Sequence, residues 1–532
     1  MNILLSDWLP VYLKDGRRVK IAPYELTNDL KSNPAVSLAF NRPDLDATVI
    51  EMLIGMLQTF YCPDERVEGM DWSYVYHNPP DPDKLRAAFE RNFSGHFTTC
   101  DDNDLHTRKV SEVFDLFGDG IRFMQDQSLS NETKIISPGD LLLDSDAVQS
   151  HFAKRQIKTL CSSCMTAVLY TLQARANSGG SGHMQSIRKG NAFTTIVKGD
   201  TLWETCWLNV LGKNTVQKYG DPTKNRPDDI FPWIKKSIKG LKLNPSEVSL
   251  FHCYWQMPRR IYLKSVNSGS CMLCHEEDTC VTEVVSSSKG FQYDGENRFH
   301  PLSPLVEKKD RKDNDKTHYE LYEHNEYDCR YKHWLALTRT DPAPSVAAAT
   351  KRNQAQKLWA FGYVCKSKLA LAWDEGEFLI VTLPTGDKLE EKDAENVVRL
   401  LIDMASKAAE HLQKYAGKAV ALIAKGEKGR KVKFPMIDKE PFSARFWQAS
   451  ENDFYSYIER LQNVVSGAIT LEEVKLDWSK RVRFHALNVF DSLADFEAFD
   501  SETMSIIAEH RAALMNTLSR KEGKVGKIKI PQ

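Results

Sequence analysis

Two Cys-x-x-Cys pairs constrain the fold of this chain more than any other feature of its sequence. The first pair is Cys161 and Cys164, the second is Cys271 and Cys274, and 106 residues separate them. Each pair can place two thiolates on one tetrahedral Zn²⁺, and two such pairs complete a closed structural site. If the pairs share one metal ion, the fold must clamp two distant segments together.

The spacing alone leaves other interpretations of these cysteines open. All four could be core residues, or Cys271, Cys274, His275 and Cys280 could bind a metal within ten residues. Residues 271–275 also match the pattern of c-type haem attachment, which normally follows export. A catalytic zinc would need an open position and usually histidine or carboxylate ligands. The thiolate-rich set therefore favours a structural metal.

The composition is that of an ordinary water-soluble protein. The 532 residues are 42% hydrophobic and 27% charged, and 71 basic residues against 72 acidic ones give a net charge of −1. Such a balance excludes a globally basic nucleic-acid coat and permits local basic patches. The first twenty residues do not form a signal peptide, and eleven cysteines without one indicate reduced thiols. We therefore expect a cytoplasmic protein.

Residues 1–384 have a mixed texture that predicts an irregular α/β domain. β-rich runs predict strands at residues 2–5, 194–197 and 378–383. Helical spacing of apolar residues predicts helices at 47–60, 164–175 and 202–211. The charged run 307–316 has the composition of a solvated loop.

Residues 385–520 have longer periodic stretches, at 394–412, 453–465, 471–490 and 502–518. Thr470 and Glu473 form a capping-box signature at the start of the third stretch. Four amphipathic helices with short connections predict a four-helix bundle. The overall fold class is thus α+β, with residues 521–532 as a basic flexible tail.

A small-residue loop at residues 177–182 could bring backbone close to a ligand, because glycine lacks a β-carbon. It has neither the strand–GxGxxG–helix context of a dinucleotide site nor the ending of a P-loop, and it could equally be a mobile turn. Arg188, Lys189 and Lys198 follow it and favour a phosphate-bearing neighbour.

A second basic stretch, at residues 351–368, is interleaved with Trp359, Phe361 and Tyr363. Its aromatic residues could stack on nucleic acid or simply belong to the core of a strand. A third, at 151–158, leads into the first cysteine pair. No Ser/His/Asp order, HExxH sequence or paired carboxylates indicate an enzyme.

Taken in order, these segments resemble the large-subunit (CasA) family of the type I-E CRISPR Cascade, an RNA-guided DNA surveillance complex of bacteria. The resemblance rests on the opening residues 4–11, the block from Thr159 through the first cysteine pair and the small-residue loop to residue 211, the Phe361-Gly-Tyr sequence and the helical C-terminus. It covers essentially the whole chain.

The resemblance implies a non-catalytic protein that recognises the protospacer-adjacent motif (PAM) of double-stranded DNA from the minor groove and begins strand separation. It implies that a glycine loop, a lysine finger and a wedge turn carry out this recognition. Their counterparts here are, for the loop, Ser178, Gly179, Gly180, Ser181 and Gly182; for the finger, Lys289; and for the wedge, Lys366, Ser367 and Lys368.

The resemblance further implies a structural Zn²⁺ and several partners. A loop with Phe152, Lys154 and Arg155 would contact the 5′ region of the guide RNA and a neighbouring Cascade subunit. The bundle would contact other subunits and help to recruit a helicase-nuclease. This chain has Ser178 and Ser181 where glycine can stand, and Lys366 and Ser367 where relatives carry other polar groups. The competing functions are a zinc-dependent hydrolase or nuclease and a structural scaffold.

Overall fold

The computed structural model describes residues 1–93, 108–144, 156–178, 182–219, 224, 226–294, 298–309, 317–323, 329–366, 369–387, 389–425, 442–494 and 501–525. The chain divides into two compact units. The first comprises Met1–Glu326 and Leu337–Leu379, and the second comprises Tyr327–Ala336 and Ile380–Gln532. The mixed first part followed by a helical region confirms the predicted α+β fold class.

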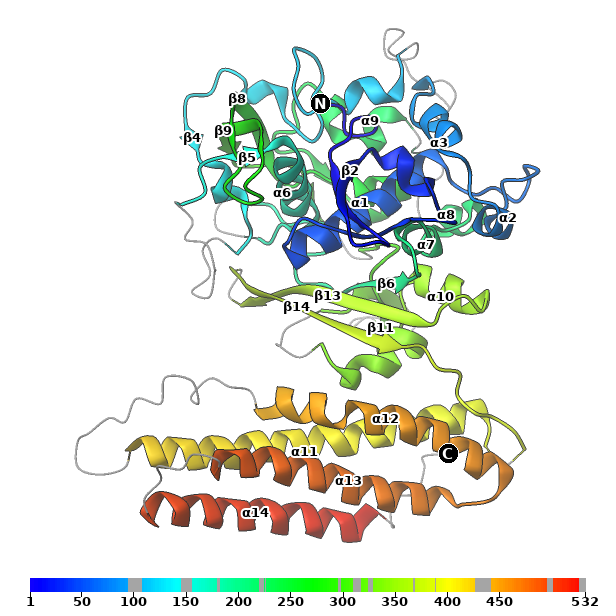
Figure 1. Cartoon of the computed structure of the whole chain (residues 1–532), viewed down its shortest axis with the longest axis vertical. Coiled ribbons are helices and arrows are strands. Elements are labelled where there is room, and N and C mark those ends of the chain that lie inside the picture. The colour runs from blue at the N-terminus through cyan, green and yellow to red at the C-terminus, as the bar shows by residue number, and fades with distance from the viewer. Residues whose placement is uncertain are drawn as a thin grey trace. The chain divides into compact units, whose positions relative to one another are not determined.

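The first unit combines short helices with several small sheets (Figure 1). Its helices are α1 Pro43–Phe60, α2 Trp72–His77, α3 Pro82–Phe89, α6 Ser162–Arg175, α7 Leu202–Leu208, α8 Lys213–Tyr219, α9 Pro227–Ile230 and α10 Pro344–Lys351. Its strands are β1 Leu9–Leu13, β2 Arg18–Ile21, β3 Ala35–Leu38, β4 Ile135–Ile136, β5 Leu160–Cys161, β6 Thr194–Lys198, β7 Lys242–Leu243, β8 Arg260–Ser270, β9 Glu277–Ser287, β10 Gln292–Tyr293, β11 Leu305–Lys309, β12 Thr317–Leu321, β13 Lys357–Lys366 and β14 Leu369–Leu379.

Two of the sheets place the predicted functional segments. In one, the long antiparallel strands β8 and β9 form a hairpin, and β4 and β5 also pair with β9. In the other sheet, the strand order is β14-β13-β6, and both pairs of neighbouring strands are antiparallel. The turn between β8 and β9 therefore carries the second cysteine pair, and β13 ends at Lys366, the first residue of the predicted wedge.

The helices α1 and α6 form the centre of the first unit and pack against each other. Almost every residue of both helices is buried, and buried polar side chains pair between them, as where the Thr48 and Thr171 hydroxyls lie 2.5 Å apart. An aromatic cluster lies beside them, in which the Phe60, Phe114 and Trp255 rings are 5.5 to 6.5 Å apart. Both helices confirm predictions from apolar spacing.

Several predicted elements of the first unit differ from the structure. Residues 2–5 form a bridge and a turn instead of a strand, although Ile3 and Leu4 are fully buried. The strand predicted at 378–383 ends at Leu379, and the helix predicted at 202–211 ends at Leu208. Part of the charged run 307–316 lies in the exposed strand β11, which pairs with β12. In these segments, burial and strand pairing determined the secondary structure more than local composition did.

The second unit contains the helices α11 Glu391–Lys425, α12 Phe442–Ser466, α13 Leu471–Asp491 and α14 Ser501–Val525 (Figure 1). Each of the four predicted periodic stretches lies within one of them. The capping box at the start of α13 is present, since Thr470 Oγ1 accepts from Glu473 N at 3.2 Å and Glu473 Oε2 accepts from Thr470 N at 2.7 Å. α14 continues to Val525, past residue 520 where the tail is predicted to begin.

The core of this unit also includes a segment from far earlier in the chain. The Tyr331 ring stacks on Phe454 of α12 at 4.3 Å, and its hydroxyl lies 2.9 Å from Ser450 Oγ. The indole of Trp478 in α13 donates to the Leu401 carbonyl of α11 at 2.9 Å. Among the described helices of both units, none has the length and hydrophobicity needed to span a membrane.

Candidate metal centre and nucleic-acid interface

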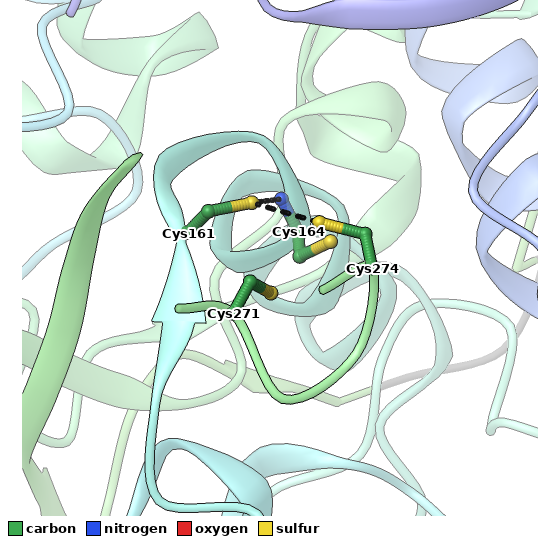
Figure 2. Close-up of side chains that lie close together, drawn as sticks. All are labelled: Cys161, Cys164, Cys271 and Cys274. Atoms are coloured by element: carbon green, nitrogen blue, oxygen red, sulfur yellow. Dashed lines mark hydrogen bonds between the residues drawn. The ribbon is translucent and has the colours of Figure 1, made fainter. Parts of the chain in front are cut away.

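The four cysteines of the two Cys-x-x-Cys pairs lie together (Figure 2). Their sulfur atoms are all within 4.8 Å of one another, and those of Cys161 and Cys274 are 3.6 Å apart. Four sulfurs bound at about 2.3 Å to one tetrahedral zinc would be about 3.8 Å apart. Three of the cysteines are buried and Cys274 is half-buried. The set therefore has the size and chemistry of a four-thiolate metal centre.

Backbone pairing brings the two pairs together. Cys161 ends β5, where it pairs with Cys280 of β9, and its sulfur caps α6 by accepting from Cys164 N at 3.4 Å. The second pair occupies the turn between β8 and β9. Met272 N in that turn donates to the Thr159 carbonyl at 3.0 Å. The hairpin and the helix start are thus fixed to each other through main-chain hydrogen bonds.

The thiols of the second pair are biased toward the thiolate form that binds metal. Hydrogen bonds from Cys161 and Cys164 lower the pKa of Cys274 to about 7 and hold the pKa of Cys271 well below its ordinary value. Contacts with the neighbouring sulfurs instead raise the pKa of Cys161 and Cys164 above the ordinary value, so within the cluster only the second pair is biased toward thiolate.

The other candidate ligands lie outside the cluster. Cys280 donates to the Gly269 carbonyl at 3.2 Å, and His275 is exposed with a left-handed φ of 63°. Among the described residues, the four cysteines are the one group placed to share a metal ion. This arrangement favours the two-pair ligand set over the local set with His275 and Cys280, and it disfavours haem attachment because Cys271 and Cys274 face the first pair.

The predicted lysine finger lies directly against the end of the small-residue loop. Lys289 N donates to the Gly182 carbonyl at 2.7 Å, and the Lys289 carbonyl accepts from Gly240 N at 2.7 Å. These bonds hold Lys289 at a left-handed φ of 62°, which a residue with a β-carbon adopts at a cost of about 1–2 kcal/mol. The Lys289 side chain is exposed, and no ion-pair partner for it is found among the described residues.

Two glycines permit this close approach. Gly182 has a φ of +84°, and a β-carbon there would lie 2.7 Å from Ser288 Cβ. Gly290 follows the lysine, and a β-carbon there would lie 2.3 Å from the Pro258 carbonyl oxygen. Side chains at either position would push the lysine turn away from its neighbours.

A half-buried arginine, Arg259, bridges the neck of the loop. The Arg259 guanidinium donates to the Asn177 carbonyl at 2.5 Å and to the Met184 carbonyl, which flank the loop on its two sides. Its backbone is held by Gln173 of α6 at 2.9 and 3.0 Å. Burial lowers the pKa of Arg259 to about 10, so it remains charged at neutral pH. The two ends of the loop are therefore held at a fixed separation.

A fully buried network joins the segments before and after the same loop. Arg175 before the loop and Arg188 after it both donate to the Glu51 carboxylate of α1, the former at 3.0 Å. His300 Nε2 is 3.5 Å from the same carboxylate, and burial holds the pKa of His300 well below its ordinary value. All four side chains are fully buried. Sequence reasoning missed this network, and its signal was one glutamate within an apolar helix.

The end of the β13–β14 hairpin also approaches the loop. β13 ends at Lys366, and its neighbour Cys365 lies beside Asn177. Burial raises the pKa of Cys365 to about 11, against an opposing hydrogen bond with Asn177. Loop, lysine turn and hairpin end thus belong to one region of the first unit.

The remaining predicted contacts require correction. Arg188 is buried on Glu51, while Lys189 pairs with Glu323 at 3.6 Å and Lys198 pairs with Glu377. All three are engaged by carboxylates, so they do not form the expected phosphate site. Phe361 and Tyr363 are buried in the core of the sheet, which supports the core interpretation of the aromatic stretch.

Other predicted residues lie outside the part of the chain that the structure describes. Ser178 lies within it and is half-buried. The residues outside it are Gly179, Gly180 and Ser181 of the loop, Phe152, Lys154 and Arg155 of the RNA-contact segment, and Ser367 and Lys368 of the wedge, together with the side chain of Lys366.

Comparison with known proteins identifies the family. The family model of the CRISPR-associated protein Cse1 matches residues 2–98 and 101–489. The chain belongs to the Cse1 family.

Solved Cse1 structures share the fold over the whole chain. CasA from Thermus thermophilus is 16% identical with a TM-score of 0.65, and 98% of this chain and 99% of that one are covered. Cse1 from Acidimicrobium ferrooxidans is 14% identical with a TM-score of 0.63, covering 99% of each chain. A chain of a CRISPR RNA-guided surveillance complex is 13% identical with a TM-score of 0.60, covering 97% and 99%. The resemblance to the CasA family is thereby confirmed.

Proposed function

We propose that this Cse1 protein is the large, non-catalytic subunit of a type I-E Cascade and reads the PAM of double-stranded DNA. The observation that carries this proposal is the hydrogen bond between Lys289 N and the Gly182 carbonyl. It places an exposed lysine without an ion-pair partner among the described residues at the end of a small-residue loop. The family membership and the match to a chain of a surveillance complex support the same role.

The chemistry of the minor groove suits such a pair of elements. The groove presents mainly acceptors in a degenerate pattern, so a lysine ammonium and loop backbone can read a short motif with tolerance. Guide RNA pairing then supplies the sequence specificity. Because Arg259 and backbone hydrogen bonds hold the loop neck and the lysine turn in place, these two parts need little ordering when DNA binds.

Strand separation would begin at the hairpin end. Opening one duplex step costs about 1.4 kcal/mol, which a wedge at residues 366–368 and a few phosphate contacts can offset. We assign the segment with Phe152, Lys154 and Arg155 to the guide RNA 5′ region and a neighbouring subunit. The helical unit is assigned to other Cascade subunits and to recruitment of the helicase-nuclease.

We assign the four-cysteine centre to structural Zn²⁺. Cys161, Cys164, Cys271 and Cys274 would hold it, and four thiolates leave no open position for a reacting water. The ion would stabilise the fold and fix the β8–β9 hairpin, whose far end leads to Lys289. This donor set supports a structural metal over the hydrolase alternative.

The proposal is tested by replacing the lysine finger in the reconstituted complex. Lys289→Ala should weaken binding of a target duplex by about 10-fold or more, since base contacts contribute about 1–3 kcal/mol each. Lys31→Ala is the matched control, because Lys31 is also exposed and has no ion-pair partner among the described residues. Equal binding by wild type, Lys289→Ala and Lys31→Ala would contradict the proposal.

A further inference from the structure

Two further exposed lysines, Lys236 and Lys239, lie in a segment beside the Lys289 turn. Lys236 and Lys239 belong to the segment of residues 235–242, which we call the basic segment. It was not identified from the sequence, because it has no aromatic interleaving and no recognisable motif. Its position comes only from the fold.

Backbone bonds join the basic segment to the lysine turn. Gly240 N donates to the Lys289 carbonyl at 2.7 Å, and Gln292 N donates to the Leu241 carbonyl at 2.8 Å. The two stretches then continue side by side as the parallel strands β7 and β10. Since Lys289 N donates to Gly182, the loop, the lysine turn and the basic segment form one hydrogen-bonded series.

A side-chain network beneath the surface ties the same parts together. Arg260 reaches Ser128 Oγ at 2.9 Å and the Ser288 carbonyl at 3.4 Å, and Ser237 Oγ lies 3.3 Å from Ser128 Oγ. Arg260 is buried and pairs with Asp126 at 2.6 Å. Ile238, between the two exposed lysines, is also buried. The basic segment is thus anchored from below and presents its lysines outward.

The four lysines of the basic segment differ in whether a carboxylate lies close to them. Lys235 is neutralised by Asp228 at 2.6 Å, and Lys242 lies 3.9 Å from Asp294. Lys236 and Lys239 are exposed, and neither has an ion-pair partner in the described part of the chain. Together with Lys289, they are three exposed lysines without an ion-pair partner among the described residues, on segments that backbone hydrogen bonds join.

We propose that Lys236 and Lys239 bind backbone phosphates of the duplex whose motif Lys289 contacts. This inference rests on the proposed function and gives the basic segment a separate role. Phosphate contacts set position and contribute affinity without reading sequence. Each lysine contact releases counterions, so binding should depend on salt with a slope of about 0.9 per phosphate neutralised.

The test compares duplex binding by the reconstituted complex over a series of salt concentrations. The double variant Lys236→Ala/Lys239→Ala should lower the slope of log K against log salt by about 2 and weaken binding most at low salt. Its preference among flanking sequences should remain that of the wild type. The double variant Lys236→Arg/Lys239→Arg keeps both charges and should keep the slope, which separates loss of charge from loss of structure.

Lys289→Ala in the same series distinguishes the two proposals. If Lys289→Ala weakens binding while the double alanine variant keeps the full slope, the phosphate site is refuted and the proposed function stands. A changed flank preference in the double alanine variant would also overturn the assignment, because it would indicate base contacts. If Lys289→Ala itself has no effect, the proposed function fails.

Discussion

At the scale of single residues, Gly182 controls how closely the loop approaches the lysine turn. Gly182→Ala would add a β-carbon 2.7 Å from Ser288 Cβ, whereas Gly16 has a similar φ of +86° and nothing within 4 Å. Both alanine variants should lose about 1–2 kcal/mol of stability from the left-handed backbone. Only Gly182→Ala should also weaken duplex binding by the reconstituted complex. Similar binding by the two variants would show that the close approach does not matter.

Replacing Glu51 tests how much the buried network contributes to stability. Glu51→Gln leaves Arg175 and Arg188 buried without a carboxylate and should lower the free energy of unfolding by about 3–5 kcal/mol. Glu377→Gln is the control, since it removes a partly exposed pair with Lys198 and should cost less than about 1 kcal/mol. Urea unfolding followed by tryptophan fluorescence measures both. Equal midpoints would mean that the buried network contributes little.

The sequence predicted some of these residues and could not predict others. The four cysteines were predictable because two Cys-x-x-Cys pairs carry their chemistry in their spacing. The Glu51 network was not, because Arg175 and Arg188 are 124 and 137 residues away from it. The same limit applies to Arg188, whose sequence neighbours suggested phosphate binding while the fold buries it.

At the scale of elements, the metal centre links the β8–β9 hairpin to α6. Cys161→Ser should lower the zinc content below one ion per chain. It should also lower the midpoint of thermal unfolding, because metal binding contributes directly to folding. Cys280→Ser should keep the full zinc content, since Cys280 lies outside the cluster. Metal analysis with thermal unfolding measures both. Zinc retained in Cys161→Ser and lost in Cys280→Ser would contradict the ligand set.

Helices were easier to predict than strands for a physical reason. Apolar residues at helical spacing carry the signal of α11 to α14 within each element. Strands depend on partners elsewhere, so the buried residues 2–5 resembled a strand without forming one, and the long β8–β9 hairpin was not predicted.

At the scale of the whole molecule, the second unit is not continuous in sequence. Tyr331 and Trp334, both fully buried, reach its core from a segment that precedes β13. Such insertion cannot be read from periodicity, because the segment is too short to show any. The predicted boundary at residue 384 accordingly omits a segment that the structure assigns to the helical unit.

Replacing Tyr331 tests whether this inserted segment stabilises the helical unit. Tyr331→Ala removes the ring on Phe454 and the contact with Ser450, and should destabilise the unit by about 3–5 kcal/mol. Tyr74→Ala, at a site that is 51% exposed, is the control and should have a small effect. Hydrogen exchange of α12 should become faster only in Tyr331→Ala. Unchanged exchange would show that the segment is dispensable for the bundle.

PAM recognition by this chain is tested most directly by duplex binding with randomised flanking trinucleotides. The surveillance complex is reconstituted with and without this chain, and bound targets are sequenced. We predict that binding depends on the flank only when the chain is present, and that Lys289→Ala removes this dependence while Lys31→Ala preserves it. Binding that ignores the flank with the wild-type chain in place would contradict the assignment of PAM recognition.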